Sequence, residues 1–163
     1  MQMKIIVSIP CRAWLTDLPD VVTTSERVVR LTVAYANLEC DQIEVGVTLT
    51  DNVEIRTLNR DYRQQDEATN VLSFAGHDLN APRFPGPLLL GDIVLAHGVL
   101  LEEAKQLGKK LHEHYCHLLV HGTLHLLGHD HADREQAAEM EATEIAILAS
   151  IGISDPYERC LNL

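Results

Sequence analysis

The run 118–127 is almost entirely apolar, yet it carries two histidines, His121 and His125, that are four positions apart. On a helix this spacing places both imidazoles on one face, one turn apart. A helix that is apolar on almost every side is buried on most of its sides, so these polar rings need partners inside the protein. A shared metal ion would satisfy both rings, and this requirement constrains the fold more than any other feature of the chain.

Beyond His125 the chain continues through Gly128 to His131. A glycine there can adopt a positive φ and end the helix, and the turn can bring His131 back toward the first two rings. Two helical histidines and a third after a glycine give zinc three nitrogen ligands and leave its fourth position open for water. An open position favours reactivity. The pattern therefore predicts a metal-dependent hydrolase with one divalent ion on His121, His125 and His131. Zinc is the expected metal, although three imidazoles also suit nickel and other divalent ions.

The same ligand spacing, with a glycine at the same place, is the signature of the metzincin proteases. Those enzymes carry a glutamate directly after the first histidine, where it acts as the general base. Here that position is Gly122, so the metal ligands are kept and the protease base is missing. A metalloprotease-like zinc hydrolase remains an alternative, disfavoured because the loss of a general base slows hydrolysis by orders of magnitude.

Other blocks of the sequence accompany the histidine pattern. They read Asn-Arg-Asp-Tyr-Arg at 59–63, Thr-Asn-Val-Leu-Ser-Phe at 69–74, Leu-Gly-Asp-Ile at 90–93 and Asp-Pro-Tyr at 155–157. Together with 121–131 these blocks resemble the YbeY family of bacterial metal-dependent endoribonucleases, which are linked to ribosomal RNA maturation. The resemblance extends from about Asn59 to Tyr157, and the N-terminal third matches only in its general layout.

The resemblance implies a single-strand-specific endoribonuclease that acts in ribosomal RNA processing, at the 3′ end of 16S ribosomal RNA, and in ribosome quality control. It also implies contact with the small ribosomal subunit and with an Era-type GTPase, partners that composition and spacing do not indicate. A third possibility is a non-catalytic ribosome-assembly factor whose metal is structural. Three ligands with an open position disfavour it, since structural zinc sites are usually four-coordinate and closed.

Arg56, Arg60 and Arg63 recur at helical spacing and form either a local basic stripe or a solvated helix face. The planar guanidinium of arginine suits a phosphodiester, whose reaction develops negative charge. The resemblance places Arg63 at the family's arginine position, and we expect it to be catalytic; the alternative is a surface salt bridge with Asp61 or Asp66. The net charge of −11 argues against indiscriminate nucleic-acid binding and makes a local cation more necessary.

The late segment 132–151 is strongly acidic, with Arg134 as its one basic residue. A solvated helix face is the expected explanation for its acidic residues, Asp133, Glu135, Glu139, Glu141 and Glu144.

Two polar residues lie close to the predicted ligands. His117 is one turn before His121, where it is a fourth ligand, a donor behind the ligands or, as we favour, a hydrogen-bonded neighbour. Asp130 precedes His131 and either orients a ligand imidazole or caps the last helix, and we favour the cap.

Hydrophobic periodicity and turn residues predict the elements that hold this site. We expect strands at 4–9, 43–49, 71–74 and 88–96, and helices from Thr24 or Ser25 onward, from Asp51 to about Tyr62, and over 99–107, 110–127 and 132–150. The expected fold class is α+β: a single domain over 1–163 with a four-stranded, mixed but mostly parallel sheet, about five helices and a zincin-like metal helix.

Cellular location and redox state are constrained by what the sequence lacks. No apolar run approaches the ~20 residues that cross a bilayer, and the N-terminus has no secretory signal. We therefore expect a cytoplasmic protein without membrane contact. Cys11, Cys40, Cys116 and Cys160 show neither zinc-finger nor redox spacing, so no structural disulfide is expected.

Overall fold

The strands and helices follow the predicted hydrophobic pattern closely. The computed structural model describes residues 1–158. Its elements are, in order, β1 (Gln2–Ser8), α1 (Ala13–Asp17), α2 (Val21–Tyr35), β2 (Gln42–Thr50), α3 (Asn52–Arg63), β3 (Val71–Ala75), β4 (Leu88–Ala96), α4 (His97–Leu107), α5 (Leu111–Leu126) and α6 (Arg134–Ser150). The predicted α+β class is confirmed.

The four strands form one mixed sheet in the order β1-β2-β4-β3. β1, β2 and β4 are mutually parallel, whereas β3 pairs antiparallel with β4 and forms an edge. Parallel neighbours need a crossover connection, and α2 supplies it between β1 and β2. The predicted mixed, mostly parallel sheet is therefore confirmed.

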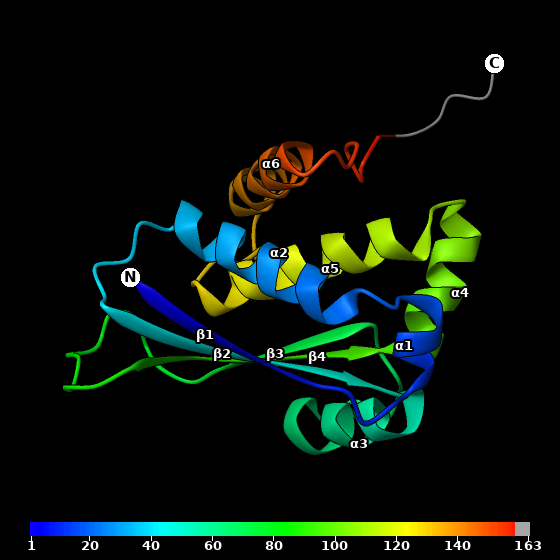
Figure 1. Ribbon diagram of the computed structural model, residues 1–163, viewed down its shortest axis with the longest axis horizontal. Helices are drawn as coiled ribbons and strands as arrows, with labels where there is room; N and C mark the ends of the chain where they lie inside the picture. The colour runs from blue at the N-terminus through cyan, green and yellow to red at the C-terminus, as the bar shows by residue number, and fades with distance from the viewer. Residues whose placement is uncertain (159–163) are drawn as a thin grey trace.

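Helices cover the two faces of the sheet unequally (Figure 1). α2, α4 and α5 lie on one face, and α3 is the helix of the described chain that lies on the other. The larger core fills the first interface, where Val45 and Val47 of β2 meet Val29 of α2 and Leu119 of α5, all fully or almost fully buried. A smaller apolar cluster beneath the sheet joins Ile55 of α3 to the strands. Both clusters follow from the alternation of apolar and polar residues in the strands.

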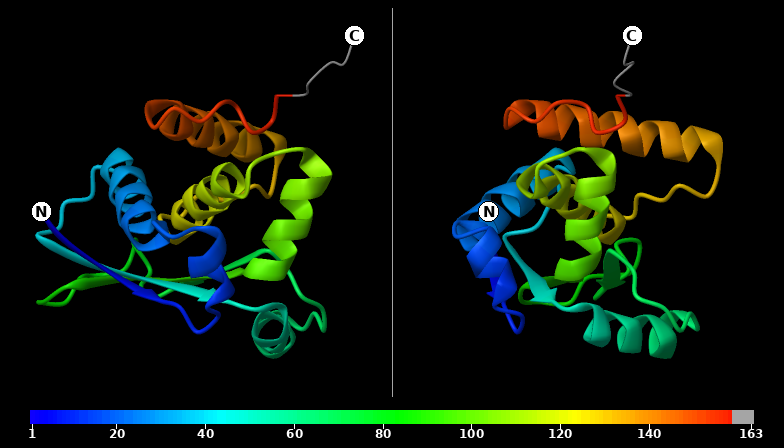
Figure 2. Two further views of the ribbon diagram at one scale, coloured as in Figure 1. Left: turned by 45° about the vertical axis from the view of Figure 1, so that its right-hand side comes forward. Right: turned by 90° about the vertical axis from the view of Figure 1, so that its right-hand side faces the viewer.

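α5 is the central helix of the molecule. Figure 2 shows it between the sheet and α6, and it also contacts α2 and α4. Burial on most sides is what its nearly continuous apolar sequence predicted. The helix begins after Lys110 and ends at Leu126, close to the predicted limits of 110 and 127.

Two details at the N-terminal end differ from the expectation. α2 begins at Val21 and not at Thr24 or Ser25. The five-residue helix α1 was not predicted, and it brings the helices within residues 1–158 to six. It is held by Trp14, which is fully buried and donates from Nε1 to the carbonyl of Thr50 at 3.0 Å. A tryptophan anchor of this kind leaves no periodic signal in so short a segment.

Within residues 1–158, no helix has both the length and the apolar character needed to cross a membrane. Cys11, Cys40 and Cys116 are free thiols. The expectation for Cys160 lies outside the described residues.

Candidate metal centre

The three predicted ligands lie together at the C-terminal end of α5. His121 and His125 occupy successive turns of its last part. The helix stops at Leu126, and Gly128 follows with φ of +92°, a left-handed conformation that favours glycine. This turn reverses the chain and brings His131 back to the two helical rings.

One ring nitrogen from each histidine converges on a common point. The three atoms lie within 4.8 Å of one another. The two Nε2 atoms of His121 and His125 are 3.1 Å apart. The ring of His131 lies with its centroid 5.8 Å from that of His121 and 5.1 Å from that of His125. The prediction that these three residues come together is therefore met by the geometry.

The donor set fits a divalent transition metal. Two nitrogens at ~2.0–2.1 Å from zinc in tetrahedral geometry lie ~3.3 Å apart, close to the measured separation of the two Nε2 atoms. Burial, followed by the neighbouring rings of His121 and His131, lowers the pKa of His125. The neutral imidazole, which is the form that binds metals, is thereby favoured. His121 and His125 are half-buried and His131 is exposed, so the cluster opens on one side to solvent.

Glu144 of α6 is the residue of this site that sequence reasoning missed. Its carboxylate was expected on a solvated helix face, but it is fully buried beneath the histidines. One oxygen accepts from Nδ1 of His121 at 2.6 Å, and the other accepts from Nε2 of His117 at 2.8 Å and from the hydroxyl of Tyr157. Met140, Glu144 and Ile147 are all buried on one side of α6, and their helical spacing is a weak sequence signal that the acidic residues around Glu144 obscure.

Hydrogen bonds outweigh desolvation at this carboxylate. Burial alone would raise the pKa of Glu144, but donation from His117, His121 and Tyr157 brings the pKa to about 2. Burial and then the carboxylate itself raise the pKa of Tyr157, so its hydroxyl is the donor. His117 is thus a hydrogen-bonded neighbour, as favoured from the sequence, and lies outside the three-histidine cluster.

Arg63 lies at the last position of α3, on the wall of an open cleft of about 440 Å³. His121 and His125 line the same cleft, together with Ser73 of β3. The Nη2 atom of Arg63 donates to the carbonyl of Ser73 at 2.9 Å, and its guanidinium carbon lies 5.0 Å from the ring centre of Phe74. These contacts fix the guanidinium beside the edge strand β3, in the cleft that His121 and His125 also line.

The other arginines of α3 are paired with carboxylates. Arg56 binds Asp66 and Arg60 binds Asp61, each at 3.0 Å and on the surface. Both aspartates that could have formed a salt bridge with Arg63 are thus engaged elsewhere. Within residues 1–158, Arg63 has no carboxylate partner, which leaves its charge available to a ligand in the cleft.

Gly122 lies where α5 contacts the sheet. The hydroxyl of Ser73 donates to its carbonyl at 2.9 Å. A Cβ added there would lie 2.8 Å from Cγ2 of Ile93 and 3.1 Å from the Ser73 hydroxyl. The position that carries the general base in the proteases is therefore packed against β3 and β4, and a glutamate side chain has no room there.

Asp130 does not cap the last helix, contrary to the favoured expectation. Asp133 is the N-cap of α6 and accepts from the backbone N–H of Gln136 at 2.8 Å. Asp130 accepts from the backbone N–H of His131 at 2.7 Å, so it shapes the turn that carries the third ligand. The sequence does not distinguish two aspartates three residues apart, because both precede an acidic helix start.

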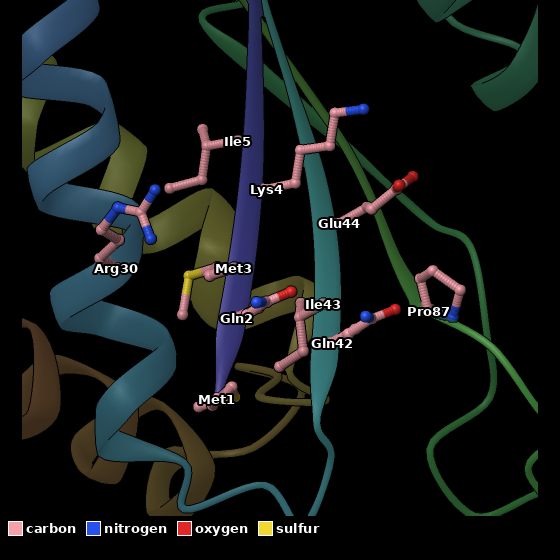
Figure 3. Close-up of a pocket in the computed structure, with 10 residues that line it drawn as sticks. All are labelled: Met1, Gln2, Met3, Lys4, Ile5, Arg30, Gln42, Ile43, Glu44 and Pro87. Carbon is pink, nitrogen blue, oxygen red and sulfur yellow. The ribbon is translucent and has the colours of Figure 1, made fainter.

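A larger hollow, of about 640 Å³, lies at the opposite edge of the sheet (Figure 3). Residues of β1 and β2 line it, with Arg30 of α2. It shares no lining residue with the cleft, and its described lining includes no histidine or cysteine. Size alone therefore does not identify the functional site of this fold.

Comparisons with known proteins agree with this site. The sequence profile of a family described as "Endoribonuclease YbeY" matches residues 15–152. A relative named "Endoribonuclease YbeY" from Paramagnetospirillum magneticum is 47% identical over 157 residues, which is 95% of this chain and 96% of that protein. Another of that name, from Agrobacterium fabrum, is 40% identical over 161 residues, with 95% of each chain covered.

A solved structure shares the fold. The solution structure of TM1509 from Thermotoga maritima superimposes with a TM-score of 0.54 at 18% identity, covering 99% of each chain. The profile match covers most of the chain, and the relatives are similar over nearly their whole length. This chain therefore belongs to the YbeY endoribonuclease family.

Proposed function

We propose that this protein is a metal-dependent endoribonuclease that cleaves single-stranded RNA in ribosomal RNA processing. The observation that carries the proposal is the convergence of three imidazole nitrogens within 4.8 Å, with His121 and His125 lining a cleft that Arg63 also lines. The names of the relatives, which identify them as endoribonucleases, support the same reaction class.

His121, His125 and His131 would hold one divalent ion, for which zinc is the first candidate. When bound, such an ion supplies a Lewis acid toward a phosphate and makes water easier to deprotonate. Three neutral imidazoles leave the charge of the ion uncompensated, so the site attracts an anionic substrate. This charge matters because the chain as a whole carries −11 and repels RNA at long range.

Arg63 would hold the scissile phosphate. One of its N–H groups is used by the carbonyl of Ser73 and another reaches the carbonyl of Tyr62 at 3.3 Å. A guanidinium has five N–H donors, so donors remain for phosphate oxygens. Its planar fork can hold two oxygens at once and stabilises the charge that develops on phosphorus.

The substrate and partners follow from the family. We infer ribosomal RNA as the substrate, with the 3′ end of 16S ribosomal RNA as the region that is matured. The small ribosomal subunit and an Era-type GTPase are the proposed partners, and the cytoplasm is the proposed location. A peptidase is disfavoured, because position 122 packs against Ile93 and Ser73 and cannot carry the protease base.

The experiment that tests the proposal is cleavage of a ribosomal RNA fragment that contains single-stranded segments. The purified protein is assayed as prepared, after removal of metal by a chelator, and after Zn²⁺ is restored. Cleavage that is lost with the metal and regained with it supports the proposal. Cleavage of a peptide library that requires His121, without RNA cleavage under the same conditions, would reverse it.

A further inference from the structure

A buried carboxylate lies directly behind the histidine cluster. Glu144 of α6 is fully buried and accepts hydrogen bonds from His121, His117 and Tyr157. We propose that Glu144 is a positioning residue of the metal centre: it holds His121 in the tautomer that presents Nε2 to the cleft, while Tyr157 holds the carboxylate in place. This inference rests on the proposed metal site.

The direction of the hydrogen bond decides which nitrogen of His121 is free. An ionised carboxylate has no proton to give, so the 2.6 Å contact requires a proton on Nδ1 of His121. In the neutral ring, Nε2 then carries the lone pair. That Nε2 is the atom 3.1 Å from Nε2 of His125, on the side of the cleft. The carboxylate thus fixes the tautomer and the orientation of the ring and raises its basicity as a ligand.

The second oxygen of Glu144 is held from two other directions. Nε2 of His117 lies 2.8 Å from it, and the hydroxyl of Tyr157 donates to it as well. A buried charge is tolerated only when several donors satisfy it, and here the donors come from α5 and from the segment after α6. The carboxylate is therefore held in one orientation and cannot turn away from His121.

This network explains the Asp-Pro-Tyr block at 155–157, which the proposed chemistry did not use. The carboxylate of Asp155 accepts from the backbone N–H of Tyr157 at 2.8 Å and shapes the turn. Lys109 donates to the carbonyl of Pro156 at 2.5 Å and fixes the segment on the α4–α5 connection. Both contacts hold the partly exposed Tyr157 ring against His117, with the two ring centroids 5.2 Å apart.

The affinity of the protein for Zn²⁺ provides the first test. Glu144→Gln keeps the shape of the side chain, but it replaces one accepting oxygen with an NH₂ group. That group then faces a hydrogen-bond donor of His121, His117 or Tyr157 and cannot accept from it. Competition against a chromophoric chelator should show binding weakened about 10- to 100-fold. Glu141→Gln makes the same change at an exposed position one turn earlier on α6 and should bind like the unaltered protein. Equal affinity of Glu144→Gln and the unaltered protein would overturn the proposal.

A second measurement needs no variant, and so it stands even where Glu144→Gln fails to fold. Nitrogen chemical shifts of the histidine rings in the metal-free native protein report which nitrogen is protonated. We expect His121 with its proton on Nδ1, bonded to the carboxylate. A proton on Nε2 would contradict the proposed role of Glu144.

Tyr157→Phe tests the part of the proposal that concerns Tyr157. It removes one of the three donors to Glu144 and should weaken Zn²⁺ binding by a smaller factor than Glu144→Gln does. Unchanged affinity would show that Tyr157 does not help to hold the carboxylate in place.

Neither the Zn²⁺ affinity nor the histidine nitrogen shifts depend on RNA cleavage. The proposed function and the proposed role of Glu144 can therefore be contradicted independently of each other. Native protein that binds Zn²⁺ tightly but cuts no RNA contradicts the proposed function and leaves the role of Glu144 intact. Native protein that cuts RNA in a metal-dependent way, with unchanged Zn²⁺ affinity in Glu144→Gln, contradicts the role of Glu144 alone.

Discussion

The hydroxyl of Ser73 on β3 lies 2.9 Å from the carbonyl oxygen of Gly122 on α5 and donates a hydrogen bond to it. The carbonyl of the same serine accepts from Arg63 at 2.9 Å. Ser73 therefore links the arginine on one wall of the cleft to the helix that carries two of the three histidines.

Gly122→Glu should destabilise the protein strongly and should not create a peptidase. A Cβ at this position already lies 2.8 Å from Cγ2 of Ile93. Overpacking a well-packed core costs typically ~1–3 kcal/mol, and a longer charged side chain adds the penalty of burying a charge. The melting temperature should fall by several degrees at least. Ala146→Glu, which adds the same side chain at an exposed position of α6, is the control. A stable Gly122→Glu protein would contradict the close contact between α5 and the sheet.

Stability should fall as the pH drops below about 6.5, in part because of His114. This ring is 5% exposed, and its Nε2 contacts Glu103 at 3.0 Å. Burial lowers the pKa of His114, and the bond to Glu103 only partly opposes this. A folded-state pKa below the unfolded value means that the unfolded chain binds the proton first. The stabilising contribution of neutral His114 is therefore fully present above the pKa that His114 has in the unfolded chain. It is lost as the pH falls through the lower pKa that His114 has in the folded protein.

The measurement is the free energy of unfolding by urea between pH 8 and pH 5. His114→Asn removes the titrating ring, so its stability should fall less steeply over this range. The difference in slope is at most about 1.4 kcal/mol per pH unit, the value for one proton. Equal slopes in the two proteins would show that His114 does not titrate differently on unfolding.

The sheet and the metal helix could be predicted because their signals are local and periodic. β2 alternates apolar and polar residues, and Asp51 caps α3 by accepting from the N–H of Glu54 at 2.9 Å, as its position suggests. The three metal ligands follow from helix geometry and one glycine turn. Such features depend only on residues that are close together in the sequence, so local patterns are enough to predict them.

Glu144 could not be predicted in the same way, because its partners are distant in the chain. It lies 23 positions after His121 and 13 before Tyr157. Its surroundings in the sequence are acidic, and charge pattern alone indicates solvent exposure. Only the packing of α6 on α5 turns this one carboxylate inward. In the sequence, only the family resemblance distinguishes Arg63 from the other two arginines of its helix, whereas the fold distinguishes it by the carboxylate partners of those two.

His125→Ala should abolish stoichiometric metal binding. Among the described residues, His125 contributes one of three converging nitrogens, and two imidazoles hold zinc far more weakly than three. Elemental analysis of the purified variant should find well under one ion per chain. His129→Ala is the matched control, since His129 lines the same cleft without belonging to the cluster. One tightly bound ion in a variant with all three ligands replaced by alanine would show that the metal lies elsewhere.

Arg63 should be required for RNA cleavage and not for metal binding or folding. It is exposed and lines the same cleft as His121 and His125, so it can contact a substrate without being a ligand. Arg63→Lys keeps the charge but loses the planar fork, and cleavage should stay impaired. Arg63→Glu should be worse because it repels phosphate, with a loss on the order of 10²–10³-fold, typical for removal of one group that stabilises transition-state charge.

The control for Arg63 is Arg60→Glu, on the same helix, whose side chain is paired with Asp61 at 3.0 Å on the surface. Exposed ion pairs contribute little to stability, so this variant should fold, and its charge change matches that of Arg63→Glu. Rates are compared at matched metal content and matched melting temperature. An equal loss in both variants would mean that only the overall charge matters, because Arg63 lines the cleft with the histidines and Arg60 does not. Full activity in Arg63→Glu would remove Arg63 from the site, and the RNA phosphate would then have to be held by the metal centre alone.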